Sequence, residues 1–360
     1  MYKILVMNLG STSTKVAYYE DEKSVYSENI DHPADEIKKF ATFWDQEEYR
    51  LDLIRKFLKE HNIKLEDLDA IVSRGGHTKP LVSGAYKVVP EMLEQQKSGK
   101  WGQHPADLGS KMAYSLSQGV KATALIVDPP ITDEFEPVAR ISGHPLFQRR
   151  SSFHALSHKA TAKRYAKENN KKYEDLNLIV VHLGGGISVA PHKKGKMIDG
   201  DNALEGDGTF STNRTGALPV GDLVRLCFSG EYTYEQVHKM INGEGGLVAY
   251  LGTQNVKEVE EKSHTDEKAA LILGAMIYQT CKEIGAMATV LEGKVDQILL
   301  TGGIAHSETI VAKIKERVEW IAPITVYPGE NEMKSLALGA LEGLKGDVPF
   351  KDFVKETEGE

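Results

Sequence analysis

The sequence predicts an α/β protein of two related domains, each built on a mixed sheet, that face each other across a central cleft. Three observations predict this fold. A strand–turn–strand pattern occurs in both halves of the chain, helical patterns alternate with the strands, and 360 residues are enough for two domains that each bury a core.

The repeated pattern first covers residues 4–19, ILVMNLGSTSTKVAYY, and then residues 179–190, IVVHLGGGISVA. Each copy starts with an apolar run, passes through a polar residue and Leu-Gly, and returns as a second apolar run after a turn of small residues. We interpret residues 297–305, QILLTGGIA, as a third and shorter copy. The same unit in both halves indicates two related domains.

Helical periodicity fills the segments between these copies. In residues 51–61, LDLIRKFLKEH, apolar side chains recur at the spacing that places them on one helix face. Further helices are expected at residues 155–168, 268–291 and 333–344.

Two segments, residues 84–90 and 199–219, contain many turn-forming residues and are expected to be irregular. Long irregular segments inside compact domains often carry function. We place the first domain at residues 1–146 together with 333–360, and the second domain at residues 147–332.

Charge and cysteine content limit the function. A net charge of −8 gives little attraction to a nucleic-acid backbone, so we expect no nucleic-acid partner. Cys227 and Cys281 lie in no CxxC or Cys/His cluster, which argues against a disulfide framework and fits a reducing compartment. Neither a signal-peptide pattern nor an apolar run of the ~20 residues that span a bilayer is present, so we expect a cytoplasmic protein without a membrane partner.

The first repeated turn offers a possible phosphate site. Residues 8–15, NLGSTSTK, follow a buried strand and supply backbone N–H groups, hydroxyls and one ammonium, which together match the charge of a phosphate. The spacing is not that of a Walker A loop. A solvated hairpin turn is the equally plausible alternative.

The second repeated turn, residues 182–186 (HLGGG), has three consecutive glycines that allow a ligand to approach the backbone closely. A tight hairpin or bulge would use the same residues, and the echo of the first turn is what favours a binding role. Gly302-Gly303 form a third turn at a strand end, where a plain strand-to-helix turn is the alternative.

Several charged residues are candidates for chemistry. His154 and His158 lie four residues apart and would share a helix face, but a zinc site would need a third ligand, and the glutamate of the HExxH motif is missing. Arg214 lies in a polar loop, where it is either functional or a surface charge. Asp128 ends a buried strand, where it can serve Mg²⁺ or orient a catalytic group, or only cap the following turn.

Taken together, these motifs resemble the acetate and butyrate kinases, a family with actin/ribonuclease-H-like domains within the acetate kinase–sugar kinase–Hsp70–actin group. Residues 8–15 resemble the first family signature, N-x-G-S-[ST]-S-x-K, and residues 182–188 resemble the second, H-x-G-x-G-x-S. TGGI at residues 301–304 resembles the nucleotide-binding turn. The resemblance spans nearly the whole chain, and residues 131–144 and 153–156 are closest to the butyrate kinase branch.

The resemblance implies a role for each matching residue. Nucleotide and phosphate binding is implied for Asn8, Ser11, Ser13, Lys15, His182, Gly184, Gly185, Gly186, Gly302, Gly303 and Ser307. Asp128 matches the catalytic aspartate, and His154 and Arg214 match the pair that stabilises the transferring phosphoryl group. Asn8 and Glu332 match residues associated with Mg²⁺.

Other positions depart from the family pattern. Thr253, Asn255 and Lys257 fall where the family contacts the nucleotide, but the residue types differ. The acetate enzymes place a substrate arginine three residues before an HGG motif. Here that position is Ile71, and Arg74 replaces the histidine, so we expect Arg74 to bind the substrate carboxylate. Phe153 is a candidate wall of the substrate pocket, and a core role for it is equally plausible.

The resemblance therefore implies an ATP-dependent kinase that uses Mg²⁺ and reversibly phosphorylates a short-chain fatty acid, either butyrate or a branched acid of similar size. A carboxylate is already ionised at pH 7 and needs no general base, so catalysis rests on positioning and charge neutralisation. Acetate or propionate kinase is the nearest alternative. A sugar kinase, with Asp128 as general base, and an actin- or Hsp70-like ATP-driven binding protein are the others. The resemblance also implies a homodimer or higher homo-oligomer built on the second domain.

Overall fold

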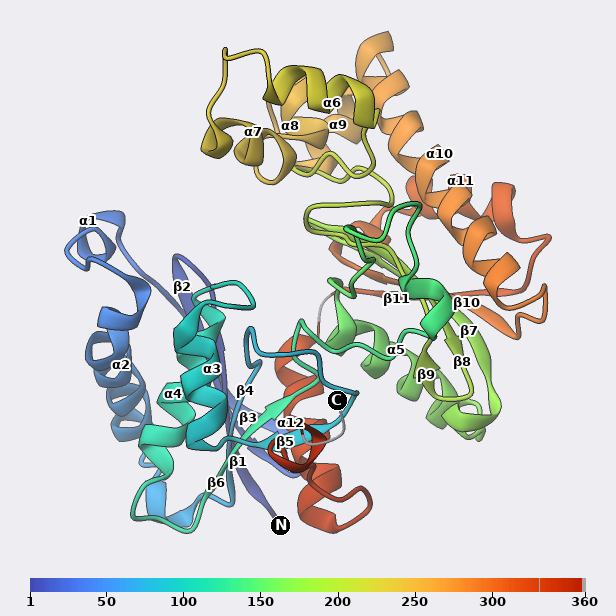
Figure 1. Cartoon of the computed structure of the whole chain (residues 1–360). Helices are drawn as coiled ribbons and strands as arrows, with labels where there is room; N and C mark the ends of the chain where they lie inside the picture. Colours follow the sequence, from blue (N-terminus) through green and yellow to red (C-terminus); the bar gives the residue numbers. More distant parts are fainter. Residues whose placement is uncertain (330, 358–360) are drawn as a thin grey trace. The chain divides into compact units, whose positions relative to one another are not determined.

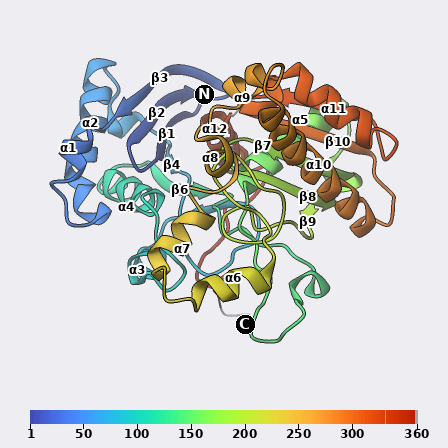
Figure 2. The same ribbon diagram turned by 90° about the horizontal axis from the view of Figure 1, so that it is seen from above.

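The computed structural model describes residues 1–329 and 331–357. It divides into two compact units, Met1–Asp133 with Asn331–Glu360, and Glu134–Glu330. Each unit contains one mixed sheet covered by helices, as Figures 1 and 2 show. This confirms the predicted α/β class of two related domains with mixed sheets.

The division between the units lies earlier in the chain than the expected position after residue 146. The backbone amide of Glu136 donates to the Ile198 carbonyl oxygen at 2.9 Å, and the ring of Phe135 stacks on that of Phe153 with centroids 6.2 Å apart. These contacts draw the segment after Asp133 into the second unit.

The first unit has a six-stranded sheet of order β3-β2-β1-β4-β6-β5. β1 is parallel to β4 and β4 to β6, and the other neighbours are antiparallel. The segment 84–90, expected to be irregular, contains the short strand β5, which pairs with β6 at the sheet edge. The elements are β1 (Lys3–Leu9), β2 (Ser13–Glu20), β3 (Lys23–Asp31), α1 (Ala34–Ile37), α2 (Glu47–Glu60), β4 (Ala70–Ser73), β5 (Ala85–Lys87), α3 (Pro90–Ser98), α4 (Ala106–Ser117), β6 (Thr123–Val127) and α12 (Glu332–Lys345).

The second unit has a five-stranded sheet of order β11-β10-β7-β8-β9, in which β10 is parallel to both β7 and β11. The segment 199–219 contains no helix or strand, as predicted, and joins β9 to α6. The elements are α5 (Ala155–Glu168), β7 (Asn177–Leu183), β8 (Ile187–Lys193), β9 (Lys196–Met197), α6 (Val220–Cys227), α7 (Tyr234–Ile241), α8 (Gly246–Leu251), α9 (Val256–Lys262), α10 (Glu267–Val290), β10 (Gln297–Gly302), α11 (Glu308–Val318) and β11 (Ile324–Pro328).

The two sheets repeat the same strand order. The hairpin β1–β2 corresponds to β7–β8, and the central strand of each hairpin pairs in parallel with the next strand, β4 or β10. The internal repeat is therefore confirmed, but its third copy was wrongly assigned. β10 does not return as a hairpin, because a helical turn and α11 follow it, and its counterpart is β4 with the glycines Gly75 and Gly76 that follow it.

Each sheet is completed by a helix that follows the last parallel strand of the other unit. α5 comes after β6 in the chain, yet its residues Ala162 and Tyr165 pack on β7 in the second unit. α12 comes after β11, yet it packs on β1 in the first unit (Figure 1). The first turn of each helix meets the polar residue near the end of the central strand: Glu332 contacts Asn8, and Ser157 contacts His182. Each unit therefore has a corresponding polar contact between the first turn of this helix and its central strand.

All four predicted helices are confirmed as α2, α5, α10 and α12, with small shifts at their ends. Among the residues that the structure describes, no helix is both long and apolar enough to cross a membrane.

Candidate active site

The predicted phosphate-binding turn joins β1 to β2 in the first unit. The Gly10 amide donates to the Ser13 carbonyl oxygen at 2.9 Å, and Ser11 at the tip of the turn is exposed. Lys15 lies opposite Asn8 in the strand register, so both side chains lie on the same face of the sheet. The turn therefore combines exposed hydroxyls with an ammonium beside an amide.

Three predicted residues meet at the carboxyl ends of β1 and β4. Asn8 Nδ2 donates to Glu332 Oε2 at 2.5 Å, and Arg74 Nη1 lies 4.0 Å from Glu332 Oε1. Glu332 is the first residue of α12, where the helix dipole favours a carboxylate. The cluster can offer oxygen ligands to a metal and a cation to an anionic group.

A residue that sequence reasoning missed, Asp107, holds the backbone that follows Arg74. This carboxylate is fully buried and accepts hydrogen bonds from the amides of His77 at 2.6 Å and His104 at 2.8 Å. A Cβ on Gly76 would lie 1.6 Å from Asp107 Oδ1, so only glycine fits there. In the sequence, Asp107 is indistinguishable from an ordinary acidic residue in the first turn of a helix.

Asp128 follows β6 in the first unit with a φ of 41°, a left-handed conformation that few side chains adopt. Its Oδ1 accepts hydrogen bonds from the Ser83 hydroxyl at 2.7 Å and the Gly84 amide at 2.8 Å. These bonds orient the carboxylate and hold the backbone before β5.

The glycine turn 184–186 joins β7 to β8 in the second unit, and His154 and Arg214 converge on it. A Cβ on Gly186 would lie 2.0 Å from Arg214 Nη1 and 3.1 Å from His154 Cε1. Arg214 Nη1 also donates to the Ala203 carbonyl oxygen at 3.0 Å. The structure thus brings together the two residues predicted to stabilise a transferring phosphoryl group, one from the start of α5 and one from the segment 199–219.

The HxxxH pair belongs to a buried hydrogen-bonded chain. Ser188 Oγ lies 2.9 Å from both His154 Nδ1 and His158 Nε2. His158 Nδ1 lies 3.5 Å from His192 Nε2, and His192 Nδ1 lies 2.6 Å from the Tyr173 hydroxyl. The rings of His154 and His182 stack with centroids 3.9 Å apart, and His182 Nδ1 lies 2.9 Å from Ser157 Oγ. These contacts make the HxxxH pair part of a hydrogen-bond chain.

Both inner histidines of this chain are held neutral. Burial, followed by the nearby His182, lowers the pKa of His158 well below its usual value. Burial, His158 and Lys159 lower the pKa of His192 in the same direction. Lys159 forms an ion pair with Glu134 at 2.6 Å. A neutral chain can fix which ring nitrogen of His154 carries the proton.

Neutral buried histidines predict a loss of stability in acid. Burial and Arg50 also lower the pKa of His32, to about 4. Unfolded histidines protonate near pH 6.5, so the unfolded chain binds more protons below that pH, and the free energy of unfolding falls as the pH drops from 6.5 toward 4. Denaturant titrations at a series of pH values measure this slope. His32→Gln should reduce the slope, whereas His264→Gln, at an exposed position, should leave it unchanged.

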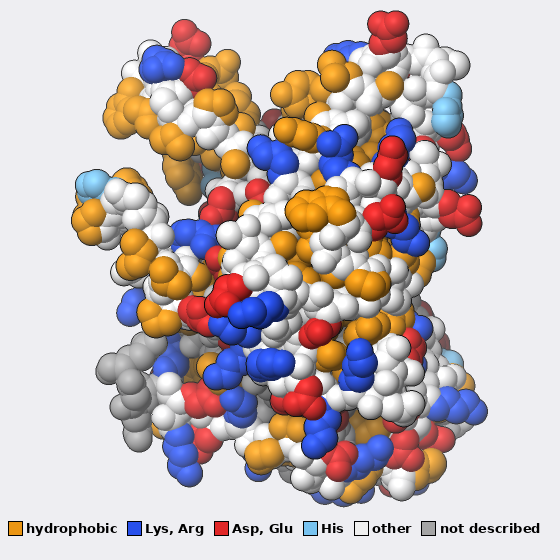
Figure 3. All heavy atoms as spheres, turned by 90° about the vertical axis from the view of Figure 1, so that its right-hand side faces the viewer, with side chains coloured by type: hydrophobic (Ala, Val, Ile, Leu, Met, Phe, Trp, Pro, Cys, Tyr) orange, Lys and Arg blue, Asp and Glu red, His pale blue; other side chains and the backbone are white. Residues whose placement is uncertain are grey.

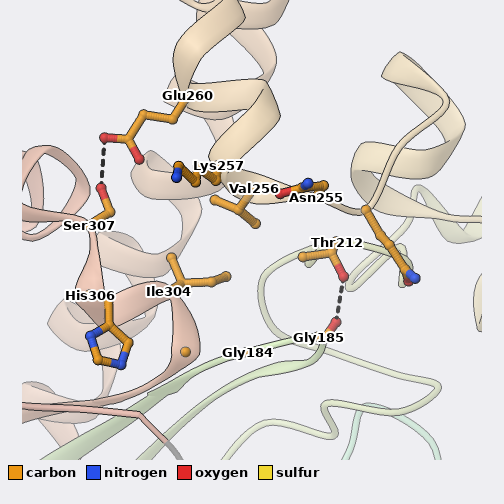
Figure 4. Close-up of a pocket in the computed structure, with 12 residues that line it drawn as sticks. Gly184, Gly185, Thr212, Asn255, Val256, Lys257, Glu260, Ile304, His306 and Ser307 are labelled. Atoms are coloured by element: carbon orange, nitrogen blue, oxygen red, sulfur yellow. Dashed lines mark hydrogen bonds between the residues drawn. The ribbon is translucent and has the colours of Figure 1, made fainter.

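A pocket of about 760 Å³ lies beside the glycine turn, within the size range of small-molecule sites. Figure 4 shows its lining side chains, which come from the turn, the start of α9 and the turn after β10. The predicted nucleotide-binding residues in the lining are Gly184, Gly185, Asn255, Lys257, Gly303 and Ser307. Predicted residues from three separate parts of the sequence therefore meet at one cavity.

Other lining residues were missed by sequence reasoning. Glu260 accepts a hydrogen bond from the Ser307 hydroxyl at 2.8 Å, and the Thr212 hydroxyl donates to the Gly185 carbonyl oxygen at 3.0 Å (Figure 4). Ser307 and Asn255 also cap α11 and α9, accepting bonds from the amides of Ile310 and Glu258. These caps place two helix N-termini at the pocket.

Two residues predicted for the site, Phe153 and Gly302, are closely surrounded by protein atoms. Phe153 is buried in a small hydrophobic cluster with Phe135, Ala190 and Met197, as a core role requires. Gly302 has a φ of 94°, and a Cβ there would lie 2.3 Å from the Leu183 carbonyl oxygen. Gly302 is thus required by the close approach of β10 to β7.

Comparison with known proteins supports the predicted family. The acetokinase family matches residues 141–333. The chain is 51% identical over 351 residues to a protein named "Probable butyrate kinase" from Clostridium botulinum (strain Alaska E43 / Type E3), with 97% of this chain and 99% of that protein covered. It is 50% identical over 354 residues to "Butyrate kinase 1" from Clostridium acetobutylicum, with 98% and 100% covered.

The fold has a similar counterpart among solved structures. The acetate kinase of Porphyromonas gingivalis matches with a TM-score of 0.77 at 19% identity, over 93% of this chain and 98% of that one. This likeness concerns the fold alone, and the family rests on the sequence matches. The chain belongs to the acetokinase family.

Proposed function

We propose that this protein is an ATP-dependent butyrate kinase, which transfers the γ-phosphoryl group of ATP to the carboxylate of butyrate or a branched acid of similar size, reversibly. The observation that carries the phosphotransferase part is the pocket beside the glycine turn, with His154 and Arg214 at Gly186. The choice of acid rests on the relatives named as butyrate kinases.

In this proposal the nucleotide occupies the pocket of the second unit. The turn 184–186 beside that pocket offers phosphate-binding donors, and in the first unit the turn 10–14 is a second phosphate-binding turn, because amide and hydroxyl donors match phosphate oxygens. Arg74 binds the substrate carboxylate. The acid is ionised at neutral pH, so no residue has to remove a proton from it.

His154 and Arg214 neutralise the charge that spreads over the equatorial oxygens as the phosphoryl group moves. We infer that the Tyr173 hydroxyl donates to His192 Nδ1. Every later hydrogen bond of the chain then has its donor on the Tyr173 side and its acceptor on the His154 side. Ser188 then donates to His154 Nδ1, and the proton of His154 lies on Nε2, where it can donate to a phosphoryl oxygen.

Asn8 and Glu332 fit a Mg²⁺ ion. Mg²⁺ usually binds one or two protein oxygens and completes its coordination with waters and phosphate oxygens. The side-chain oxygen of Asn8 and the carboxylate of Glu332 can be these protein ligands. When bound, the ion supplies positive charge to the phosphates. Asp128 orients the turn before β5 and takes no proton.

The acid preference is directly testable. Each buried methylene contributes about 0.8 kcal/mol, so the two extra methylenes of butyrate over acetate favour it by roughly fifteenfold, which a hydrophobic pocket can achieve. We expect kcat/KM to be highest for butyrate or isobutyrate when acetate, propionate, butyrate and isobutyrate are compared by trapping the acyl phosphate with hydroxylamine. Equal or better use of acetate would reject the butyrate assignment and leave the kinase assignment standing.

We also propose a cytoplasmic homodimer or higher homo-oligomer that associates through the second unit. Val220 and Val224 of α6 are exposed, and so are Phe228 directly after it and Leu271 and Tyr278 of α10. In Figure 3, hydrophobic side chains gather at the level where these helices lie in Figure 1. Sedimentation equilibrium should give at least twice the monomer mass, and Phe228→Glu should lower it, whereas a monomeric wild-type protein would contradict the proposal.

A further inference from the structure

Behind the first phosphate turn lies a buried arginine that no motif includes. Arg50, in the first turns of α2, has no exposed surface, and it shares the buried face of the helix with Leu51 and Ile54. Burial lowers the pKa of Arg50 to about 10, so the guanidinium is still charged at neutral pH. A charged group this deep in a protein is expensive unless its surroundings compensate it.

The guanidinium holds the turn by its carbonyl oxygens. Nη1 donates to the carbonyl oxygens of Gly10 at 3.1 Å and Ser13 at 3.2 Å, and to the Thr14 hydroxyl at 3.0 Å. Nη2 donates to the Ser11 carbonyl oxygen at 3.3 Å. Both Nε and Nη2 donate to Gln46 Oε1, at 3.0 and 2.9 Å. The planar guanidinium thus donates to three carbonyl oxygens and one hydroxyl of the turn.

The carbonyl oxygens are therefore drawn inward. The Thr12 carbonyl oxygen is also taken, by the His32 amide at 2.8 Å. Within residues 1–329 and 331–357, the amides of Ser11 and Thr12 donate to no backbone acceptor, and both residues are exposed. A turn whose acceptors face the interior and whose donors face the solvent suits an anion.

Among the described residues, no carboxylate pairs with the charge of Arg50. In the part of the chain that the structure describes, every hydrogen-bond acceptor of Arg50 is neutral, and no ion pair includes it. By contrast, Arg55 on the same helix is exposed and is paired with Glu48 and Asp52, at 3.0 and 2.7 Å.

We propose that Arg50 is a positioning residue for phosphate binding. It fixes the turn 10–14 in a conformation whose backbone N–H groups face the solvent, and the phosphate group that the turn receives balances its charge. The inference rests on the proposed function, in which this turn binds the phosphate chain of the nucleotide. Arg50 itself does not touch the phosphate.

The test compares Arg50→Gln and Arg50→Lys with two controls. Arg55→Gln makes the same chemical change at an exposed arginine, and Ile54→Ala destabilises the same helix without touching the turn. We expect Arg50→Gln to raise the KM for ATP by about tenfold to a hundredfold, as the loss of a positioning group or a displacement of about 1 Å can do. Arg50→Lys keeps the charge but not the fork, so its KM for ATP should rise less.

Calorimetry separates this effect from a general loss of stability. Arg50→Gln should weaken ATP binding and leave AMP binding unchanged, because AMP lacks the β- and γ-phosphates that this turn is proposed to bind. Wild-type ATP affinity in a folded Arg50→Gln variant would overturn the inference, and so would a change in Ile54→Ala of equal size. If Arg50→Gln does not fold, Arg50→Lys decides by the same criterion. Since ATP and AMP binding need no acid, a wild-type protein that fails to phosphorylate butyrate would reject the proposed function and leave this test intact.

Discussion

Arg214→Ala is expected to lower kcat by a factor of about 10³ to 10⁵, the range in which arginines that act on a transferring γ-phosphoryl group contribute. ATP affinity should change little, because Arg214 lies at Gly186 and is absent from the lining of the pocket that we propose for the nucleotide. Steady-state kinetics with saturating ATP and butyrate, together with calorimetric ATP binding, measure both quantities.

Arg225→Ala is the matched control, because Arg225 is an exposed arginine that pairs with Asp222 on α6. Its kcat should equal that of the wild type. Arg214→Lys should recover only part of the activity, since an ammonium lacks the planar fork of a guanidinium. Near-normal turnover of Arg214→Ala would show that this arginine only supports the segment 199–219.

Gly186→Ala is expected to lower kcat by about a hundredfold without unfolding the protein. The backbone of Gly186 accepts an L-residue, but the new methyl group would take the place of Arg214 Nη1, 2.0 Å away, and press on His154. The end of the arginine side chain can move aside, and a displacement of about 1 Å is enough for a loss of this size. The variant thus tests whether activity depends on the joint position of the two side chains.

Gly143→Ala in an exposed loop is the control for this change, since a Cβ there meets no atom within 4 Å. It should keep wild-type kcat. If Gly186→Ala kept full activity while calorimetry showed normal folding, His154 and Arg214 would not act together at this turn.

Local patterns predicted the parts of the fold that neighbouring residues determine. The repeat around residues 4–19 and 179–190 predicted two hairpins, and the helical period predicted α5 and α12, because apolar spacing and turn chemistry are local properties. The third copy at residues 297–305 was misassigned because a strand and a Gly-Gly turn look alike whether a strand or a helix follows.

The site was predictable where a motif carries it and not where packing creates it. The glycine turns, His154 and Arg214 stand in short signatures. Arg50 and Asp107 look like ordinary helix residues, and their function depends on which backbone oxygens or amides the fold brings to them. His158 likewise meets Ser188, 30 residues away in the sequence, only because α5 packs on the sheet of the second unit.

Helices α5 and α12 each follow a strand of one unit in the chain and pack in the other unit. This arrangement has a consequence for how the protein folds during synthesis. The second unit is continuous, from Glu134 to Glu330, and can fold as soon as that stretch has left the ribosome. The first unit lacks α12 until residues 332–345 have been synthesised, and meanwhile the apolar side chains of the sheet face that α12 covers remain open, including Val127, which lies against Gly339 of that helix. Folding during synthesis should therefore finish in the order opposite to that of most multidomain chains, in which the N-terminal domain is completed first. Residues 332–345 close the first unit after the whole second unit has been synthesised.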